Sequence, residues 1–394
     1  MKQHTIFIIL LCLYSTVTAA KLESCCMYNP EPATVIPAFG PIMSVAFSPI
    51  NGCLAAAYND GAVSILTPNT TLACSYAQTA LLTNLTYSKA HEVAFSPNGC
   101  LAVAYNDGTV NIYQPSSSTC AYTLAQTIAA PEGSPAASTV AFSPDNCLAI
   151  GYTSKEVRLF NQSSSSCTYD VSLPNTIVLD ALPHALAFSQ NGCMAVALSS
   201  GTTNVYQPNS SPKCVYTFTQ PISSSTAVAT AVGFSLAGCL AVGYSDGSIV
   251  VLQQSSTSSC TYNFVVALIP CSGVSVTAVA FTSDNCLIAA CSNSTVTVFS
   301  SSEDCNYNPQ LTQTLLPPSD ARSVNSIAVS SNNCLAIGYD NSTLVILASS
   351  KPFPSTMSTA TLSTNESSSS FSAFSPVPHN CLAVTRDQDV SFFR

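Results

Sequence analysis

One stretch of the chain, VAFSPNGCLAVAYNDGTVNIYQPSSSTCAYTLAQTI at 93–128, returns with edits along most of the sequence. A cysteine after its first apolar run marks each copy, at intervals of 46 to 48 residues: Cys53, Cys100, Cys147, Cys193, Cys239, Cys286, Cys334 and Cys381. Repeats of 40 to 50 residues are typical of solenoids and propellers, in which a single unit cannot bury its own apolar face. Neighbouring copies are therefore expected to pack side by side.

Each copy contains four short runs with the character of strands. In the second copy these are VAFSP from 93, CLAVAY at 100–105, a run at 109–113 and CAYTLAQTI at 120–128. The sequence Asn-Asp-Gly at 106–108 favours a tight hairpin turn, because all three residues tolerate positive φ. The strands carry apolar or small residues on both faces, which is typical of sheets covered on both sides. The repeats therefore predict an all-β propeller.

The last two copies are incomplete. The fourth strand of the seventh copy is degraded, and the eighth copy ends after its third strand at the C-terminus. Near the N-terminus, Cys26-Met27-Tyr28 resembles the fourth-strand sequence Cys305-Asn306-Tyr307, so we expect this segment to complete the eighth blade and close the ring. A closed ring leaves no open end to aggregate.

The predicted fold is a closed eight-bladed β-propeller of four-stranded antiparallel blades. Its expected parts are a signal peptide at 1–20 and a single propeller at 21–394, made of a closing strand with its lead-in at 21–44 and blades at 45–92, 93–139, 140–185, 186–231, 232–278, 279–326, 327–371 and 372–394.

The pattern VAFSPNG-LA-DG-V-IY resembles the WD40 and related propeller repeats over nearly all of the chain after residue 20. It departs from WD40 in two ways, since the chain has no Trp and no Gly-His before the first strand. The buried His–Ser–Trp network of that family therefore has no counterpart here. The resemblance implies a rigid scaffold that binds a partner through its loops.

The N-terminus and the composition indicate export. A polar start, an apolar run at 6–13 and the small residues Val17-Thr18-Ala19-Ala20 have the layout of a secretory signal peptide. Nineteen cysteines suit an oxidising compartment, and no later apolar run is long enough to span a membrane. Ten Lys plus Arg and a formal charge of −9 argue against nucleic acid as a partner. We expect a secreted, periplasmic or cell-surface protein.

The cysteines predict a disulfide inside each blade. Six copies carry a second cysteine 19 to 21 residues after the first, which gives the expected pairs Cys53–Cys74, Cys100–Cys120, Cys147–Cys167, Cys193–Cys214, Cys239–Cys260 and Cys286–Cys305. The third strand separates the two members by about 9 to 10 Å, so the loop before the fourth strand must fold over to bring them within about 7 Å. By the same register we expect Cys26–Cys381. Cys271–Cys291 and Cys25–Cys334 are assigned to the remaining cysteines.

Candidate catalytic and metal-binding patterns have simpler structural explanations. Gly243-Tyr244-Ser245-Asp246-Gly247 matches the nucleophile-elbow pattern, but it occupies a turn between strands with no following helix. Asp60, Asp107 and Asp246 recur at that turn and are interpreted as turn formers. His91, His184 and His379 fall at different repeat positions. Adjacent Cys25-Cys26 resemble the vicinal disulfide of quinone-dependent eight-bladed dehydrogenases, but those enzymes stack their cofactor on Trp. No catalytic residue, cofactor or metal is expected.

The sequence contains seven N-x-Ser/Thr sequons, which would carry glycans in a eukaryotic secretory route and would be plain polar loop residues in a bacterium. They begin at Asn69, Asn84, Asn161, Asn209, Asn293, Asn341 and Asn365.

Three functions are compatible with such a chain. The first is a non-catalytic scaffold that binds a protein or glycan through the variable loops between blades, for example 129–138 and 223–230. The second is a hydrolase or lyase acting on glycans or peptides from the same face, which requires converging carboxylates, for which Asp180, Glu92 and Glu132 are candidates. The third is a structural surface or envelope protein that associates with itself. The binding scaffold is the preferred interpretation.

Overall fold

The computed structural model describes residues 26–350, with gaps at 39, 84–87, 117–119, 134, 164–166, 224–226, 258 and 301–303, and the backbone of three C-terminal strands within 372–393. The chain divides into two compact units, 26–350 in one and 1–25 with 351–394 in the other.

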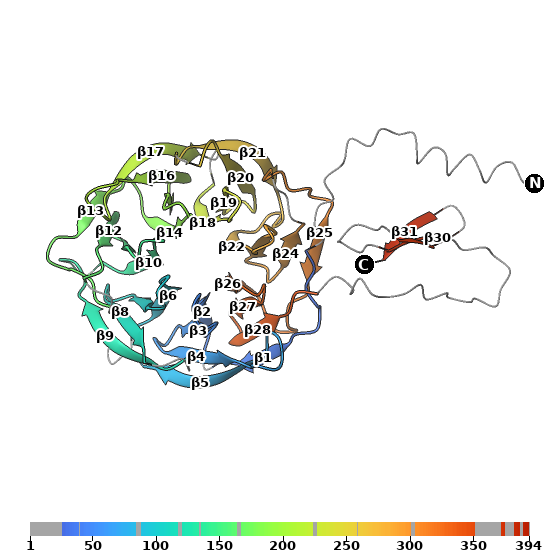
Figure 1. Ribbon diagram of the computed structural model, residues 1–394, viewed down its shortest axis with the longest axis horizontal. Helices are drawn as coiled ribbons and strands as arrows, with labels where there is room; N and C mark the ends of the chain where they lie inside the picture. The colour runs from blue at the N-terminus through green and yellow to red at the C-terminus, as the bar shows by residue number, and fades with distance from the viewer. Residues whose placement is uncertain are drawn as a thin grey trace, which may run out of the picture. The chain divides into compact units, whose positions relative to one another are not determined.

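The unit at 26–350 is a ring of seven four-stranded antiparallel sheets (Figure 1). In each blade the first strand, here called the inner strand, lies nearest the centre, and the fourth, the outer strand, lies on the circumference. Blade one consists of β2(Ile42–Phe47), β3(Leu54–Tyr58), β4(Val63–Pro68) and β5(Tyr76–Leu82), blade two of β6(Ala90–Phe95), β7(Leu101–Tyr105), β8(Val110–Pro115) and β9(Tyr122–Ile128), and blade three of β10(Ala137–Phe142), β11(Leu148–Tyr152), β12(Glu156–Phe160) and β13(Asn175–Val178). Blade four consists of β14(Pro183–Phe188), β15(Met194–Leu198), β16(Thr202–Pro208) and β17(Tyr216–Ser223), and blade five of β18(Ala229–Phe234), β19(Cys239–Tyr244), β20(Ile249–Gln254) and β21(Tyr262–Leu268). Blade six consists of β22(Val276–Phe281), β23(Leu287–Cys291), β24(Val296–Phe299) and β25(Thr312–Leu315), and blade seven of β26(Val324–Val329), β27(Leu335–Tyr339) and β28(Thr343–Leu347), completed by β1(Thr34–Pro37).

The expectation of eight blades is wrong, because the N-terminal segment completes the seventh blade and not the eighth. β1 pairs antiparallel with β28, with Val35 opposite Val345, and Tyr28 bridges to Ser349. The Gln313 side chain of blade six holds the Tyr28 backbone through two hydrogen bonds, at 2.7 and 2.8 Å. Within the described residues, β1 is the fourth strand of this sheet, so the N-terminal segment occupies the outer edge of the seventh blade and the ring closes there.

Blades seven and one are in direct contact, which leaves no room for another blade between them. The Val45 amide donates a hydrogen bond to the Ser326 hydroxyl (3.1 Å), and the Asn325 side chain donates to the Ile42 carbonyl (2.8 Å). The ring is therefore complete within residues 26–350.

The eighth repeat forms a sheet in the other unit. Its strands β29(Ser372–Phe374), β30(Leu382–Arg386) and β31(Asp389–Phe393) pair antiparallel. Ala373 is opposite Ala383, in the register of Ala46 opposite Ala55 in blade one. In the described residues this sheet has three strands, in the order of the first three strands of a blade.

Short-range hydrogen bonds explain the recurring Ser and Gly of the repeat. The hydroxyl of the Ser in AFS accepts the amide of the cysteine four residues later, as in Ser96 with Cys100 at 2.8 Å and Ser143 with Cys147 at 3.0 Å. This bond closes the turn between the first two strands. In the turn between the second and third strands Gly108 has φ of +85°, a conformation that is costly for residues with a Cβ.

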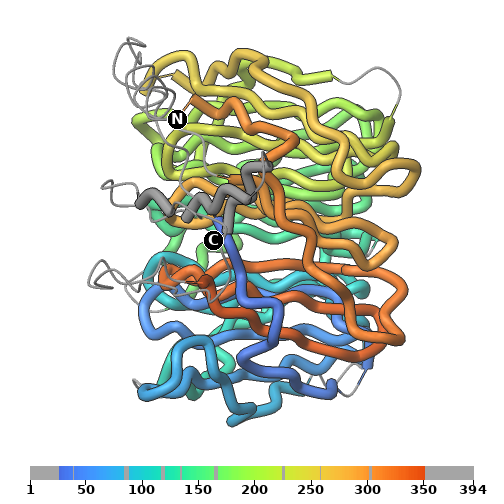
Figure 2. The backbone as a smooth tube through the Cα atoms, turned by 90° about the vertical axis from the view of Figure 1, so that its right-hand side faces the viewer, coloured from blue at the N-terminus to red at the C-terminus, as the bar shows by residue number. Residues whose placement is uncertain are grey.

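The antiparallel strands place their connections on two faces (Figure 2). The disulfide face carries the turns between first and second strands and the loops between third and fourth strands, which hold cysteines such as Cys100 and Cys120. The connection face carries the turns between second and third strands and the segments that lead from one blade to the next.

The disulfides join neighbouring blades, so the expectation of bonds within blades is wrong. The first cysteine of each blade bonds to the second cysteine of the next blade around the ring: Cys53–Cys120, Cys100–Cys167, Cys147–Cys214, Cys193–Cys260, Cys239–Cys305, Cys286–Cys26 and Cys334–Cys74. The third strand keeps the two cysteines of one blade apart, whereas the turn of one blade lies over the loop of its neighbour. All seven junctions are therefore covalently closed.

Cys26 bonds to Cys286, which excludes the expected Cys26–Cys381 pair, and Cys74 bonds to Cys334, which excludes Cys25–Cys334. Cys25 and Cys381 lie outside the described residues. Cys271–Cys291, the remaining pair assigned from the sequence, is present in the structure and lies on the connection face.

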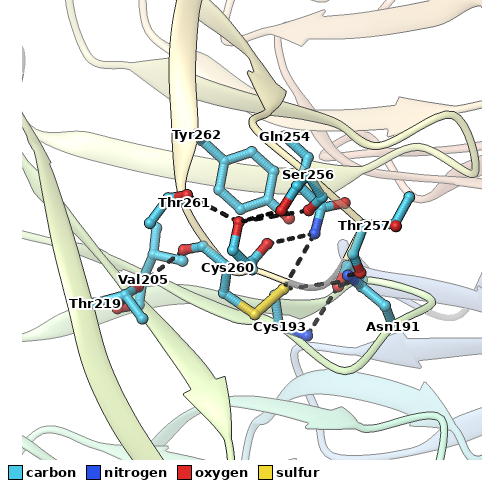
Figure 3. Close-up of a disulfide and its surroundings, with 12 residues drawn as sticks. Asn191, Cys193, Val205, Thr219, Gln254, Ser256, Thr257, Cys260, Thr261 and Tyr262 are labelled. Atoms are coloured by element: carbon cyan, nitrogen blue, oxygen red, sulfur yellow. Dashed lines mark hydrogen bonds between the residues drawn. A yellow bond between two sulfur atoms is a disulfide. The ribbon is translucent and has the colours of Figure 1, made fainter.

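Figure 3 shows the junction between blades four and five. Cys193 bonds to Cys260 with Cα atoms 5.5 Å apart. The Gln254 side chain donates to the Ser259 carbonyl (2.6 Å), and Thr219 of blade four donates to the Cys260 carbonyl (2.9 Å). The loop that carries the second cysteine is thus held by both blades.

The second strands carry small side chains because the inner strand of the next blade packs against them. All five residues of β3, β7, β11, β15, β23 and β27 are fully buried or nearly so. The penultimate residue is Ala or Gly in every blade; Gly lies beside a larger residue at three junctions, and at a fourth Ala290 packs in the same cluster as Val324. A Cβ at Gly243 would lie 2.5 Å from Val276, and one at Gly338 would lie 2.5 Å from Ile42. Three junctions instead combine Ala with Ala, as at Ala104 and Ala137.

Peptide mapping without reduction checks the disulfide pattern. We expect linked peptides whose cysteines lie 66 or 67 residues apart, together with Cys26–Cys286 and Cys74–Cys334. Links between two cysteines of the same repeat, such as Cys100 with Cys120, would contradict the arrangement of the blades.

The packing rule predicts the effect of Gly243→Ala. The added methyl group overlaps Val276, and we expect a loss of about 1 to 3 kcal/mol in the free energy of unfolding. Combining it with Val276→Ala recreates the Ala–Ala pair and should recover part of the loss, which denaturant unfolding of the single and double variants measures. Gly40→Ala, with nothing within 4 Å of the new Cβ, is the control. Additive effects of the two substitutions would contradict the packing rule.

Candidate functional site

The inner strands of the seven blades surround a cavity of about 250 Å³. It is lined by three successive residues of most inner strands: Met43, Ser44, Val45, His91, Glu92, Val93, Ser138, His184, Ala185, Leu186, Thr230, Ala231, Val232, Thr277, Ala278, Val279, Asn325, Ser326 and Ile327. Because each inner strand begins at the connection face, the first residue of each set lies nearest that face. The cavity is therefore the mouth of the central channel on the connection face.

The wall of the cavity changes from polar to apolar along the strands. The row nearest the connection face contains His91, His184 and Asn325. The third row is aliphatic, for example Val93, Val232 and Ile327. A ligand group entering from the connection face thus meets hydrogen-bonding side chains first and an apolar floor beyond them.

The middle row makes hydrogen bonds between blades on one side of the ring only. The amide of Val93 donates to the Ser44 hydroxyl (3.2 Å), and the amide of Val140 donates to the Glu92 carboxylate (2.7 Å). In blades four, five and six the same position is Ala185, Ala231 or Ala278, which offers no acceptor. The channel wall is therefore asymmetric, with its acceptors in blades seven, one and two.

Glu92 is the acidic residue in the lining of the cavity. Burial raises the pKa of Glu92 to about 7, and the hydrogen bond from the Val140 amide acts in the opposite direction. Lys and Arg are absent from the lining residues. The carboxyl group is thus poised to accept a hydrogen bond or to pair with a cation that a ligand brings.

The structure places His91 and His184 in the mouth, on the inner strands of blades two and four. The His91 ring lies 3.1 Å from the Asn106 side-chain oxygen. His379 lies outside the described residues. In the described part of the chain no group of three or more His, Cys, Asp or Glu side chains could hold a metal ion.

The turn aspartates bond to their own turns. Asp107 accepts the Thr109 amide (3.0 Å) and hydroxyl (2.6 Å), and Asp246 accepts the Ser248 amide (2.9 Å) and hydroxyl (2.6 Å). Asp60 accepts the Ala62 amide at 3.0 Å. These contacts agree with the interpretation of the three residues as turn formers.

The nucleophile-elbow pattern at 243–247 is a turn in the structure as well. The Ser245 hydroxyl accepts a hydrogen bond from the Val228 amide (3.0 Å), and Gly247 takes φ of +87°. Ser245 thus helps to hold the segment that enters blade five. Its chemical role is structural.

Of the three acids named as candidates for hydrolysis, Glu92 lines the cavity, and Asp180 and Glu132 are not among its lining residues. The sequence placed Glu92 near a loop and missed its position in the channel. The repeat alignment contained a signal for this position. The residue before the apolar run, compared across blades one to seven, is Ser44, Glu92, Thr139, Ala185, Ala231, Ala278 and Ser326. Glu92 is the one ionisable member of that series.

The sequons within the described residues lie on both faces. Asn69, Asn161 and Asn209 follow third strands on the disulfide face, and Asn293 and Asn341 lie in turns of the connection face. Asn84 and Asn365 lie outside the described residues.

The family model described as WD domain, G-beta repeat, matches residues 265–300. This segment begins in β21 and continues through β22, β23 and β24, which is the outer strand of one blade followed by three strands of the next. The comparison with curated proteins gave no match. The ring of four-stranded blades defines a closed β-propeller. With the family match to one repeat, the chain is a WD40-like propeller protein.

The raised pKa of Glu92 predicts a dependence of stability on pH. Between its ordinary value of 4.5 and about 7, the folded protein keeps a proton that the unfolded chain releases, so the free energy of unfolding falls as the pH rises. We expect about 2 kcal/mol over this window, less than the full shift implies, because the Glu92 side chain is only partly buried.

Glu92→Gln should remove this part of the slope, measured by denaturant unfolding at pH 4.5, 5.5, 6.5 and 7.5. Glu132→Gln, which removes an exposed carboxyl group from the same face, is the matched control. An unchanged slope in Glu92→Gln would contradict the assignment.

Proposed function

We propose that this protein is an exported, non-catalytic scaffold that binds a basic segment of a partner protein at the connection face, with one cationic side chain entering the channel mouth beside Glu92. The observation that carries the proposal is the cavity itself: a polar mouth, one carboxyl group and an apolar floor, in a frame closed by disulfides at every junction.

The charges of the connection face support a basic partner. Its turns and connections carry the acids Asp60, Asp107, Glu132, Asp180, Asp246, Asp320 and Asp340 and the bases Lys89, Lys155 and Arg322. This excess of acid favours the approach of a cationic segment and slows that of an anionic one. At the centre, the partly buried Glu92 carboxyl group, with no Lys or Arg among the lining residues, favours a cationic side chain.

Three features support binding over the alternatives. A two-carboxylate hydrolase needs a second acid opposite the first, and Glu92 has no acidic companion among the lining residues. The lining contains no Phe, Tyr or Trp, so it lacks the aromatic platform on which a sugar ring packs, and a protein is preferred to a glycan. Rigid frames with variable loops are where propellers carry binding sites.

Export is part of the proposal and rests on the N-terminal signal pattern and the disulfides, which persist in oxidising compartments. In the described part of the chain no helix is long and apolar enough to cross a membrane. A secreted, periplasmic or cell-surface location fits the N-terminal signal pattern and the disulfides.

Selection from a random hexapeptide library tests this function. We expect the retained peptides to carry Lys or Arg at one fixed position, and Glu92→Gln to weaken their binding at least tenfold, measured by fluorescence anisotropy. A photoreactive residue replacing His184 at the mouth should crosslink to them, whereas one replacing Leu236 on the disulfide face should not. Retention of acidic peptides, or of none, would overturn the proposal.

A further inference from the structure

A β-bulge occurs at the same position of the inner strand in all seven blades. The pairing of the inner strand with the second strand skips one residue, as between Ala90 and Glu92 and between Pro183 and Ala185. A bulge changes the direction of the side chains around it, so two successive residues of most inner strands line the channel mouth. The skipped residues, which all belong to the lining, are Met43, His91, Ser138, His184, Thr230, Thr277 and Asn325.

Two of the seven bulge residues are histidines. The chain contains four histidines, and two of them, His91 and His184, occupy bulge positions. Glu92 directly follows His91. Lys, Arg, Asp, Cys and Tyr are absent from the lining residues. The ionisable groups in the lining of the mouth are therefore two imidazoles and one carboxyl group.

Both imidazoles are placed to take up a proton without a change in the bulges. His184 is exposed, and His91 is half-buried. The side-chain oxygen of Asn106 lies 3.1 Å from Nε2 of His91. An amide oxygen only accepts hydrogen bonds, so Nε2 is the donor, and a further proton binds at Nδ1.

A fall in pH changes the charge of all three groups in the same direction. Imidazole ordinarily changes its charge between about pH 5 and 8, and desolvation raises the pKa of Glu92 to about 7. At the alkaline end of this range the carboxyl group is negative and the imidazoles are neutral. At the acidic end the carboxyl group is neutral and the imidazoles are positive. The mouth thus changes from attracting a cation to repelling one.

The other groups around these strands do not share in this change. β6 packs against β2, β3, β7 and β10, and β14 packs against β10, β11, β15 and β18; the titratable side chains of these neighbours are Tyr58, Tyr105 and Tyr152. Burial raises the pKa of all three tyrosines, so they stay neutral. Asp, Glu and Lys side chains ordinarily titrate outside the range of about pH 5 to 8. Those in the nearby turns and connections are Asp60, Lys89, Asp107, Glu132, Lys155 and Asp180.

We propose that the channel mouth holds its cationic group at neutral to slightly alkaline pH and releases it in mildly acidic surroundings, with His91, His184 and Glu92 as the groups that respond. This release rests on the proposed function, because it concerns the cationic side chain that enters beside Glu92. The ring stays folded in acid, since the proton that Glu92 keeps adds to the stability of the folded state as the pH falls from about 7 to 4.5. Release therefore comes from the charges of the mouth and not from opening of the ring.

Isothermal titration calorimetry with the full exported chain tests the proposal. The probe is the peptide acetyl-Gly-Ser-Lys-Ser-Gly-Gly-amide, whose single charge is the lysine ammonium group, and the same peptide with norleucine in place of lysine is the control. The dissociation constant of the lysine peptide should be at least tenfold higher at pH 5.5 than at pH 7.5. At pH 6.5 binding should release protons, measured as a binding enthalpy that differs between PIPES and Bis-Tris buffers.

A double variant tests the two histidines. His91→Asn/His184→Asn gives both bulges the residue that blade seven has at Asn325, and it should reduce the ratio of the two dissociation constants at least threefold. Asp145→Asn, which removes an exposed carboxyl group from a turn of the disulfide face, should leave the ratio unchanged. An unchanged ratio in the histidine variant would overturn the role of the histidines.

The two proposals fail in different ways. Binding of the lysine peptide at pH 7.5 with the same dissociation constant at pH 5.5 would overturn the release in acid and leave the proposed function standing. A lysine peptide that binds no more tightly than the norleucine peptide at pH 7.5 would overturn the proposed function, and the release in acid with it.

Discussion

Contact between neighbouring blades is the interaction on which the rest of this structure depends. A blade has apolar residues on both faces of its second and third strands and cannot bury them alone. The inner strand of the next blade covers them, and it fits because the second strand is reduced to Ala or Gly where the two meet, as at Gly243 beside Val276. A disulfide between the same two blades then fixes their separation at the disulfide face.

Closure of the ring also depends on contacts between neighbouring blades, here made by the N-terminal segment. In the described residues the N-terminal segment supplies the fourth strand of the seventh blade, and it also bonds to blade six through Cys26–Cys286 and through Gln313. The two ends of the ring are therefore joined by strand pairing, side-chain hydrogen bonds and a covalent bond. A closed and rigid frame keeps the inner strands in place, and the geometry of the channel mouth follows from that.

The channel mouth owes its character to small departures from the repeat. Seven nearly equivalent inner strands would give a symmetric wall, but Glu92 and the serines occupy one side and three alanines the other. The Glu92 side chain is partly buried because neighbouring blades surround it, and the desolvation that raises its pKa comes from the ring and not from its own strand. The outer strands, in contrast, keep the same character in every blade. None of them contains a charged residue, so the circumference of the ring is uncharged along these strands.

The sequence alone determined the strand content, the repeat length, the turns at residues such as Gly108, the four-stranded antiparallel blade and the use of the N-terminal segment as a closing strand. These features depend on short-range patterns of apolar residues, glycine and cysteine. Only the tertiary structure decided that the ring has seven blades. The sequence of the closing segment resembles the fourth strand of any blade, so the sequence does not say which blade it completes. That choice depends on how many blades fit in the ring before the last one contacts blade one. The tertiary structure also decided the partners of the seven disulfides at the blade junctions, since the two cysteines of one blade on the disulfide face are separated by its third strand, whereas Cys193 and Cys260, 67 residues apart, meet across a junction. The position of Glu92 in the channel wall was decided in the same way, by the six other blades around it.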